Sequence, residues 1–454
     1  MRDPFVQSLL SLPLGHHQIR GRGRERRRGP SRPAGRPRRS SIRWSTSCEA
    51  LLRVDIQAQG RVYSDLRPTP PASSQSGQMR FLHSSDWQLG MARAFMPAES
   101  RARYADDQIE AVRKLARIAC DNTCEFVVVA GDVFDTFQPD RRVVARAIDA
   151  LATFTVPVYL LPGNHDPDSP AALWSVGDTV DRLPPLVSLL RDSSPVSVPG
   201  TDAEVVGAPW PSGRPDADLV SQTLRSLDPV GHGQFRIVVG HGAVDTLSPD
   251  PVNPSLISVA ALESAIEEGR ASYVALGDRH STREVAERVW YSGAPVSTDY
   301  GEDPPNQALV VELQPDAILV TPVEVGAWHF VRKEFDLAGD SSVGLVESYL
   351  SDLPEKDRTV VRLALRGSIN LSTNERLEQV KQEASHLLAA LTVSEGRSDL
   401  LVLPDDTDLA QLDLSGFASA AVAELADRAA GTNAAAETAR DALMLLHRLA
   451  GRRP

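Results

Sequence analysis

Two stretches of the chain decide its fold: residues 126–135 read FVVVAGDVFD, and residues 156–166 read VPVYLLPGNHD. Each begins with a nearly continuous apolar run and ends in glycine followed by polar residues. An apolar run of this kind is typical of a strand that is buried on both faces of a sheet. Polar groups that directly follow such a strand lie at its carboxyl end, where α/β sheets gather their functional residues. The pattern therefore predicts an α/β fold with a site at one edge of a sheet.

Three further segments place polar groups at the end of a predicted strand. They are Asp86-Trp87-Gln88, Gly240-His241 and Gly277-Asp278-Arg279-His280. Consecutive asparagine, histidine and aspartate residues after a buried strand cost folding free energy unless their polar groups are used. Carboxylate, amide and imidazole groups suit hard or borderline divalent cations. The five loops together favour a two-metal hydrolase of phosphate esters.

Helical and apolar patterns alternate from Met79 onward. A strand at residues 80–83 precedes a helix at about 99–121, and a second helix is predicted at about 141–153. The later apolar runs lie closer together, at residues 205–208, 237–239, 273–276, 289–292, 309–313 and 318–325. This order predicts a sandwich of sheets with helices outside, over residues 79–325.

The composition changes after Val325. Residues 326–403 carry a predicted strand near 360–365 and a predicted helix near 374–391, which indicates a small α+β appendage. Residues 414–448 are alanine-rich with a helical pattern. Their apolar positions pack either on the appendage or on another chain. We therefore predict a C-terminal cap with a helical tail over residues 326–454.

Residues 1–78 differ from the rest in charge. They hold fifteen arginines, no lysine and five acidic residues, a net charge of +10, so that the remainder carries −22 of the total of −12. Such a segment is expected to be disordered. Three interpretations stay open: a start assigned upstream of the real one, a disordered tail, or a targeting segment. The acidic remainder argues against broad attraction of nucleic acid, but allows a local basic groove or a partner that grips DNA.

Nothing in the sequence predicts a membrane or a disulfide framework. No apolar run approaches the ~20 residues that span a bilayer. The three cysteines, Cys48, Cys120 and Cys124, indicate a reducing compartment, and we expect a cytoplasmic protein. Cys120 and Cys124 have no second pair beside them and are interpreted as ordinary thiols rather than metal ligands.

The chain resembles the calcineurin-like metallophosphoesterases, and among them the SbcD-type nuclease subunits of DNA repair. The motifs that carry the resemblance follow the family's order: MRFLHSSDWQLG, GDVFD, GNHD, GHG, YVALGDRH and VWYSGAP. They cover residues 79–325 well and the appendage loosely. The resemblance implies a four-layer α/β/β/α sandwich with two divalent metal ions at its site.

The resemblance also implies a role for individual residues. Asp86 and His280 match ligands of the first metal, Asp132 matches the bridging carboxylate, and Asn164 and His241 match ligands of the second metal. His165 matches the histidine that contacts the scissile phosphate, and Asp166 is expected to orient its ring by a hydrogen bond.

Two positions depart from the family's pattern, because Gln88 and Asp278 stand where histidines are usual. Both still offer an oxygen ligand, and oxygen in place of nitrogen favours harder ions such as Mn²⁺ or Mg²⁺. Arg279 lies between two expected ligands and either binds substrate phosphate or forms a surface salt bridge. Trp87 is expected to pack in the core, and His83 to be structural.

These expectations lead to a manganese-dependent DNA exonuclease and endonuclease. The resemblance implies an SbcC-type coiled-coil ATPase as partner, and a homodimer is common in the family. Two alternatives stay open: a hydrolase of small phosphodiesters such as cyclic nucleotides, which the acidic charge favours, and a non-catalytic scaffold that binds a partner.

Overall fold

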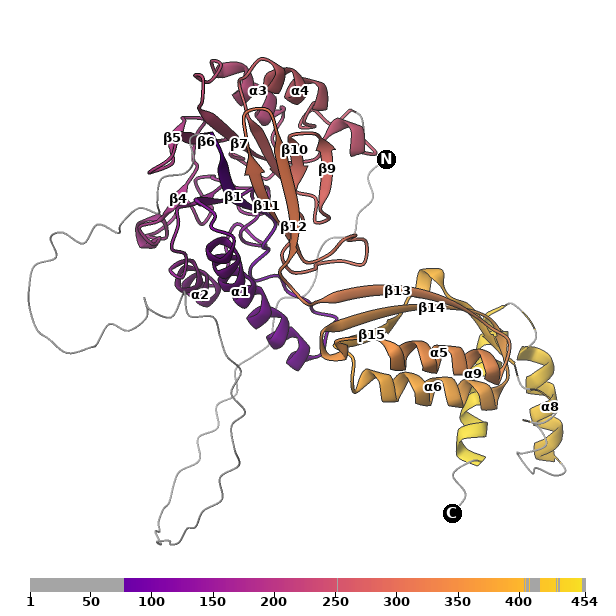
Figure 1. Ribbon diagram of the computed structural model, residues 1–454. Helices are drawn as coiled ribbons and strands as arrows, with labels where there is room; N and C mark the ends of the chain where they lie inside the picture. The colour runs from indigo at the N-terminus through magenta and orange to yellow at the C-terminus, as the bar shows by residue number, and fades with distance from the viewer. Residues whose placement is uncertain are drawn as a thin grey trace, which may run out of the picture. The chain divides into compact units, whose positions relative to one another are not determined.

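The computed structural model of the chain describes residues 77–250, 252–403, 405, 408, 417–429, 431 and 433–450. Apart from residues 77 and 78, the predicted N-terminal extension lies outside the described residues. The helices and strands form two packed sheets with helices outside them, and a third sheet with its own helices (Figure 1).

The first six-stranded sheet has a parallel core. Its order is β12-β11-β1-β2-β3-β4, in which β1 to β4 run parallel and β11 is antiparallel to both β1 and β12. The bounds are β1 Met79–Ser84, β2 Phe126–Val129, β3 Val158–Leu160, β4 Val187–Leu189, β11 Gln307–Leu313 and β12 Ile318–Glu324. Strand β2 is buried along its whole length, as its apolar sequence predicts.

The second six-stranded sheet has the order β5-β6-β7-β8-β10-β9. Strands β6, β7, β8 and β10 run parallel, and the edge strands β5 and β9 are antiparallel to their neighbours. The bounds are β5 Val196–Ser197, β6 Ala203–Gly207, β7 Phe235–His241, β8 Tyr273–Gly277, β9 Arg283–Ala286 and β10 Val289–Tyr291.

Aliphatic and aromatic side chains fill the layer between these two sheets. Phe81 and Phe126 stack with ring centres 5.0 Å apart, and Tyr273 of the second sheet meets Phe81 edge-on at 5.4 Å. All three belong to one buried apolar cluster that draws on both sheets. Edge-on and stacked pairs of this kind add to the free energy gained by burying the ring area.

Four α-helices cover the outer faces. Helices α1 (Ala98–Asp121) and α2 (Arg141–Leu151) pack on the first sheet, and α3 (Leu219–Ser226) and α4 (Val259–Glu267) pack on the second. The chain therefore has the four-layer α/β/β/α sandwich, and the predicted fold class is confirmed. The short 3₁₀ helices of the described residues are η2 Val180–Arg182, η3 Asp245–Leu247, η4 Lys356–Arg358 and η5 Glu395–Arg397.

The appendage is a parallel sheet with two helices on one face. Strand β14 pairs with β13 on one side and with β15 and then β16 on the other. The bounds are β13 His329–Leu337, β14 Thr359–Ile369, β15 Ala390–Val393 and β16 Asp399–Val402, with helices α5 Asp340–Asp352 and α6 Leu371–Ser385. Alternate β14 residues, Val361, Leu363 and Leu365, face these helices in a buried cluster.

One predicted element is wrong at its end. The helix expected over residues 374–391 stops at Ser385, and residues 390–393 form β15. A short apolar run is ambiguous between helix and buried strand, and here pairing with β14 decides for the strand. The sequence pattern also gave no prediction of α3, α4, α5 and β13.

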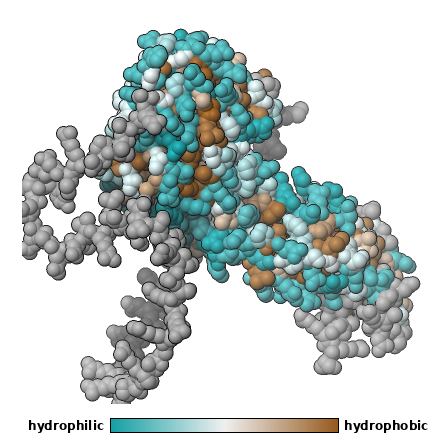
Figure 2. Space-filling model, viewed as in Figure 1, coloured by the Kyte–Doolittle hydropathy of each residue, from teal (hydrophilic) through white to brown (hydrophobic). Residues whose placement is uncertain are grey.

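The alanine-rich tail forms two helices, α8 (Phe417–Ala429) and α9 (Ala434–Ala450). Val422 and Leu443 bury against Leu371 and Val402 of the appendage, so in the described residues the tail packs on its own chain. None of the helices in the described ranges combines the length and apolar character needed to cross a bilayer. The surface seen in Figure 2 is mostly hydrophilic.

Candidate metal centre

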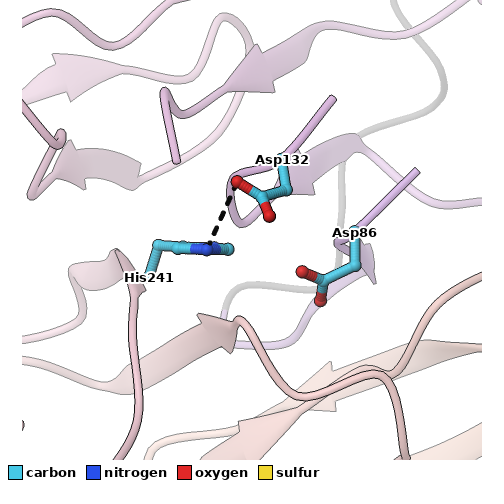
Figure 3. A group of neighbouring side chains, drawn as sticks. All are labelled: Asp86, Asp132 and His241. Atoms are coloured by element: carbon cyan, nitrogen blue, oxygen red, sulfur yellow. Dashed lines mark ion pairs between the residues drawn. The ribbon is translucent and has the colours of Figure 1, made fainter. Parts of the chain in front are cut away.

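Three of the predicted ligands come together where the two sheets meet. Asp86 follows β1, Asp132 follows β2 and His241 ends β7. One ligand atom from each lies within 4.8 Å of the others, and all three residues are buried (Figure 3). Asp86 and Asp132 follow parallel neighbours of the first sheet, and His241, more than 100 positions further along the chain, comes from the second sheet. All three lie at the ends of strands, as the sequence pattern predicts.

Two glycines allow this approach of the sheets. A Cβ at Gly131 would overlap the His241 ring, and a Cβ at Gly277 would overlap the carbonyl oxygen of Ala130. Gly131 also has φ +89°, a conformation that residues with a side chain rarely adopt. Both positions therefore require glycine for steric reasons.

The backbone at this edge is unusual at four site residues. Asp86, Gln88, Asp132 and Asp278 have φ of 53°, 49°, 56° and 97°. Aspartate tolerates the left-handed region better than most residues, but each such position still costs about 1–3 kcal/mol and tends to occur at functional sites. Four of them in one place indicate that the fold stores strain to aim these side chains.

His241 defines one half of the centre. Its Nδ1 lies 2.8 Å from the carbonyl oxygen of Ala130, to which it donates, so that in the neutral ring Nε2 carries the lone pair. Nε2 faces Asn164 Oδ1 at 2.7 Å, Asp132 Oδ1 at 3.4 Å and Asp278 Oδ1 at 3.9 Å. Four groups that can each donate an electron pair converge here, which suits a cation.

Asp86 and His280 define the other half. Asp86 is fully buried and accepts hydrogen bonds from the Ser85 hydroxyl at 2.6 Å and from the Asp278 backbone N–H at 3.1 Å. His280 Nε2 lies 3.8 Å from Asp86 Oδ1. Burial raises the pKa of Asp86 to about 6, although the neighbouring histidines oppose the shift. A bound cation would remove this cost of burying the carboxylate.

Asp132 lies between the two halves. Its Oδ1 accepts the His165 backbone N–H at 2.9 Å and faces His241, while its Oδ2 accepts the Gln88 amide Nε2–H at 2.7 Å. The Gln88 Oε1 is buried and has no hydrogen-bond partner in the described part of the chain. A buried acceptor left without a partner costs about 1–3 kcal/mol, and a cation ligated by this oxygen would satisfy it. The donor set thus fits divalent metal.

His165 is placed differently from the buried ligands, with 42% of its side chain exposed. Its Nδ1 lies 2.8 Å from the carbonyl oxygen of Asp135. The predicted hydrogen bond from Asp166 is absent among the described residues, because the Asp166 carboxylate accepts the backbone N–H groups of Gly163 and Phe134 instead. That prediction is wrong: Asp166 holds the loops, and the Asp135 backbone orients the ring.

Three residues that the sequence singled out, Arg279, Trp87 and His83, remain to be placed. Arg279 is half-buried and forms no hydrogen bond or salt bridge with any described residue, so of its two alternative roles the surface salt bridge is not formed. Trp87 is buried as expected and donates to the Ser84 hydroxyl at 2.9 Å. His83 is structural as expected: it is buried between the Tyr273 hydroxyl and the Leu276 carbonyl oxygen, and burial lowers its pKa to about 3.

Two further residues at the site were not predicted from the sequence. The Thr298 hydroxyl contacts His280 Nδ1, and Glu302 Oε1 lies 3.3 Å from the same nitrogen. Both residues lie on a loop after β10 rather than directly after a strand, and their sequence context carries no motif. Burial alone would lower the pKa of His280, but the Glu302 hydrogen bond and the Asp86 carboxylate raise it to about 9.

Comparison with known proteins identifies similar sequences. Residues 79–282 match the family model of the calcineurin-like phosphoesterases. The DNA double-strand break repair protein Mre11 of Archaeoglobus fulgidus is 33% identical over 94 residues, which is 20% of each chain. The D subunit of the nuclease SbcCD of Escherichia coli strain K12 is 27% identical over 256 residues, covering 49% of this chain and 62% of that protein.

The same nuclease subunit of Bacillus subtilis strain 168 is 32% identical over 92 residues, covering 19% of this chain and 22% of that protein. The matched region thus spans between 20% and 62% of the length of these relatives. Among solved structures, the protein TT1561 of Thermus thermophilus is 13% identical, with a TM-score of 0.35 and coverage of 54% of this chain and 98% of that one. A dimetal phosphatase from Danio rerio is 14% identical, with a TM-score of 0.34 and coverage of 55% and 98%.

Proposed function

We propose, on the premise that residues 79–282 form a calcineurin-like metallophosphoesterase domain, that this chain hydrolyses phosphodiester bonds in DNA with two divalent cations. The family predicted from the motifs is confirmed over this range; the DNA substrate and the two ions belong to the proposal. The observation that carries it is the convergence of Asp86, Asp132 and His241, which are buried within 4.8 Å of one another.

We assign the residues to the ions as follows. Asp132 is the shared carboxylate, since its two oxygens face opposite halves of the centre. Asp86, Gln88 and His280 hold one ion, and Asn164, His241 and Asp278 hold the other. The oxygen-rich set favours Mn²⁺, with Mg²⁺ as second choice. Such a pair of ions, when bound, supplies Lewis-acid stabilisation of the phosphate and a water of lowered pKa.

His165 acts on the substrate in this proposal. Because its Nδ1–H donates to the Asp135 carbonyl oxygen, the partly exposed ring is held with Nε2 toward the centre, 4.0 Å from Asp132 Oδ2. In its protonated form Nε2 donates a hydrogen bond to the phosphate or a proton to the leaving oxygen. Arg279, which forms no hydrogen bond or salt bridge among the described residues, is assigned to the phosphate as well.

A basic surface on the appendage supports DNA as the substrate. The guanidinium of Arg362 lies 4.3 Å and that of Arg332 5.1 Å from the centre of the Tyr300 ring, and neither forms a salt bridge with a described residue. They border a hollow of about 100 Å³ that Lys333 and Arg397 also line, together with Glu334, whose Oε1 lies 3.6 Å from the Arg397 guanidinium. This local cluster answers the objection from the acidic net charge, since a groove need not reflect the whole surface.

The partner, assembly and location are proposed from the relatives. Two of them are named as the D subunit of the nuclease SbcCD, and we extend to this chain an SbcC-type coiled-coil ATPase partner, a role in DNA repair and recombination, and a cytoplasmic location. Helices α8 and α9 are the proposed docking element for the ATPase, and a homodimer is the proposed assembly.

A hydrolase of small phosphodiesters is the second candidate. The charge of −22 outside residues 1–78 favours it, because polyanionic DNA is repelled by an acidic surface. Assays of the full chain with Mn²⁺ on linear duplex DNA, single-stranded DNA and bis-p-nitrophenyl phosphate separate the two. Hydrolysis of the small ester alone would favour the second candidate, and cleavage of DNA supports the first.

Replacement of His165 tests the proposed chemistry. His165→Ala is expected to lower turnover by about 10²–10⁴-fold, because the donor to the phosphate is lost, while both ions stay bound. Turnover and metal content are measured on the same preparation, with the exposed His232→Ala as control. Loss of metal together with turnover would contradict the role assigned to His165.

A further inference from the structure

A buried glutamate faces the outer nitrogen of a candidate metal ligand. Only 5% of the Glu302 side chain is exposed, and its Oε1 lies 3.3 Å from His280 Nδ1. The Thr298 hydroxyl lies between them: it donates to Glu302 Oε1 and contacts His280 Nδ1. Since a hydroxyl has one proton, a Thr298 that donates to Glu302 presents a lone pair to His280.

Glu302 itself is held firmly by its loop. Its carboxylate accepts the backbone N–H of Thr298 at 2.9 and 3.0 Å and that of Asp299 at 3.0 Å. A carboxylate with several charge-assisted hydrogen bonds has little freedom to turn. The position of Glu302 is thus fixed independently of His280.

The loop that carries these residues is fixed in turn to the sandwich and to the appendage. Arg93 donates to the carbonyl oxygen of Thr298 and stacks over Tyr104 and Phe330, with its guanidinium 5.5 and 5.4 Å from the ring centres. Asn306 joins the loop's two ends, since its Oδ1 accepts the Ser297 N–H at 2.8 Å. Movement of this loop is therefore opposed from several sides.

We propose that Glu302 is a positioning residue for His280, acting directly and through the Thr298 hydroxyl. It keeps the proton on Nδ1 and so turns the unprotonated Nε2 toward Asp86 and a divalent cation. Carboxylates that bind the far nitrogen of a ligating histidine in this way fix its tautomer and its ring orientation. This inference rests on the proposed function, and it assigns a residue outside the range of the family match.

A simpler interpretation is that Glu302 only closes its own turn. The backbone N–H groups of Thr298 and Asp299 would be satisfied by that arrangement alone. It does not account for the approach of Oε1 to His280 Nδ1, nor for one hydroxyl that contacts both side chains. The two interpretations differ in what they predict for metal binding.

Calorimetric titration of the metal-free full chain with Mn²⁺ tests the proposal. We expect Glu302→Gln to weaken the binding of one of two ions by up to about tenfold, and to leave the binding of the other unchanged. Asp299→Asn is the matched control: it removes the same charge from the same loop, and its amide oxygen still accepts the Tyr300 N–H. Thermal unfolding of the metal-free variants shows whether the fold is kept.

A double-mutant cycle with His280→Ala separates positioning from a merely structural role. If Glu302 acts through His280, Glu302→Gln has no further effect on Mn²⁺ affinity once His280 is alanine. Where Glu302→Gln does not fold, Thr298→Val replaces it in the cycle, with Thr298→Ser expected to restore affinity.

Several results would overturn the inference. One is an unchanged Mn²⁺ affinity in a folded Glu302→Gln variant, and another is an equal loss of affinity for both ions. A third is a double-mutant cycle in which the effects of Glu302→Gln and His280→Ala on Mn²⁺ affinity add. These outcomes are distinct from a failure of the proposed function. A wild-type chain that binds two ions but cleaves no DNA overturns the function alone, whereas one that binds no ion overturns both.

Discussion

The two halves of the candidate metal centre are built by different means. The His241 side chain is fully buried and its Nδ1 donates to a backbone carbonyl oxygen, that of Ala130 beside β2. The His280 side chain is 27% exposed and its Nδ1 is held by side chains of a loop, Thr298 and Glu302. One half is thus held by the sheet itself, and the other depends on the loop after β10 that carries Thr298 and Glu302. We expect the His241 half to bind its ion more tightly.

Removal of the shared carboxylate has the largest expected effect, since it breaks both halves together. Asp132→Ala should lower turnover by at least about a thousandfold and release both ions. Metal analysis and turnover on bis-p-nitrophenyl phosphate check this, with the exposed Asp149→Ala as control. Retention of either ion would show that Asp132 does not bridge.

The comparison is tested directly by truncating each histidine. His241→Ala leaves buried carboxylates uncompensated and should lower the affinity for one Mn²⁺ ion by at least about 100-fold. His280→Ala should weaken the other by about tenfold, because water reaches the partly exposed position and replaces the ligand. Calorimetric titration with Mn²⁺ measures both. Equal losses would mean that the two halves do not differ as described.

Without metal the two halves should respond alike to pH. Burial lowers the pKa of His241 and His280, but neighbouring carboxylates, with the Glu302 hydrogen bond at His280, raise both to about 9. The folded values lie above the unfolded value of 6.5, so protonation of these two histidines stabilises the folded state. This contribution is fully present below pH 6.5 and is lost as pH rises through 9. A tenfold change in a proton-binding constant corresponds to about 1.4 kcal/mol.

The chelated protein should therefore melt at a lower temperature at pH 9.5 than at pH 6.5. With Mn²⁺ bound, the cation takes the place of the protons, and the melting temperature should change much less with pH. Melting curves with and without chelator across this range check the sign. A chelated protein whose melting temperature is flat over this range would contradict it.

A smaller change is expected at Gln88. Gln88→His offers a nitrogen in place of the Oε1 that has no partner in the described structure, and it should preserve turnover or raise it a fewfold, by about 1 kcal/mol or less in barrier. Affinity of the His280 half for Mn²⁺ is measured alongside. A large loss would indicate that the amide Nε2–H bond to Asp132 matters more than the ligand oxygen.

The sequence predicted what local pattern encodes. Strands that are buried on both faces and end in Gly-Asp or Gly-Asn-His are recognisable from sequence alone, and this pattern predicted Asp132 and Asn164 at the site. Asp86 and His241 have weak local signals and were predicted from the order of the five loops and from the family resemblance. The orientation of His165 was missed because a backbone carbonyl oxygen, that of Asp135, performs it, and every residue has one. Glu302 was missed for a related reason: its partner lies 22 positions away on another loop.

The appendage shows the same limit. The run at residues 387–391 is apolar enough for a helix or a strand, and only the neighbouring β14 selects the strand. The left-handed conformations of Gln88 and Asp278 were equally hidden, because neither residue type demands them. Long-range partners, rather than local preference, decide such positions.

The absence of space at Gly131 and Gly277 has a practical use. A methyl group at either position would collide with the very atoms that bring the two sheets together at the centre. A related chain with alanine at one of these places can keep its strands and helices and still be unable to assemble the pocket. Replacement of the glycine at either of these two positions is thus a sequence marker for inactive members of this fold, and it can be checked before any assay is run.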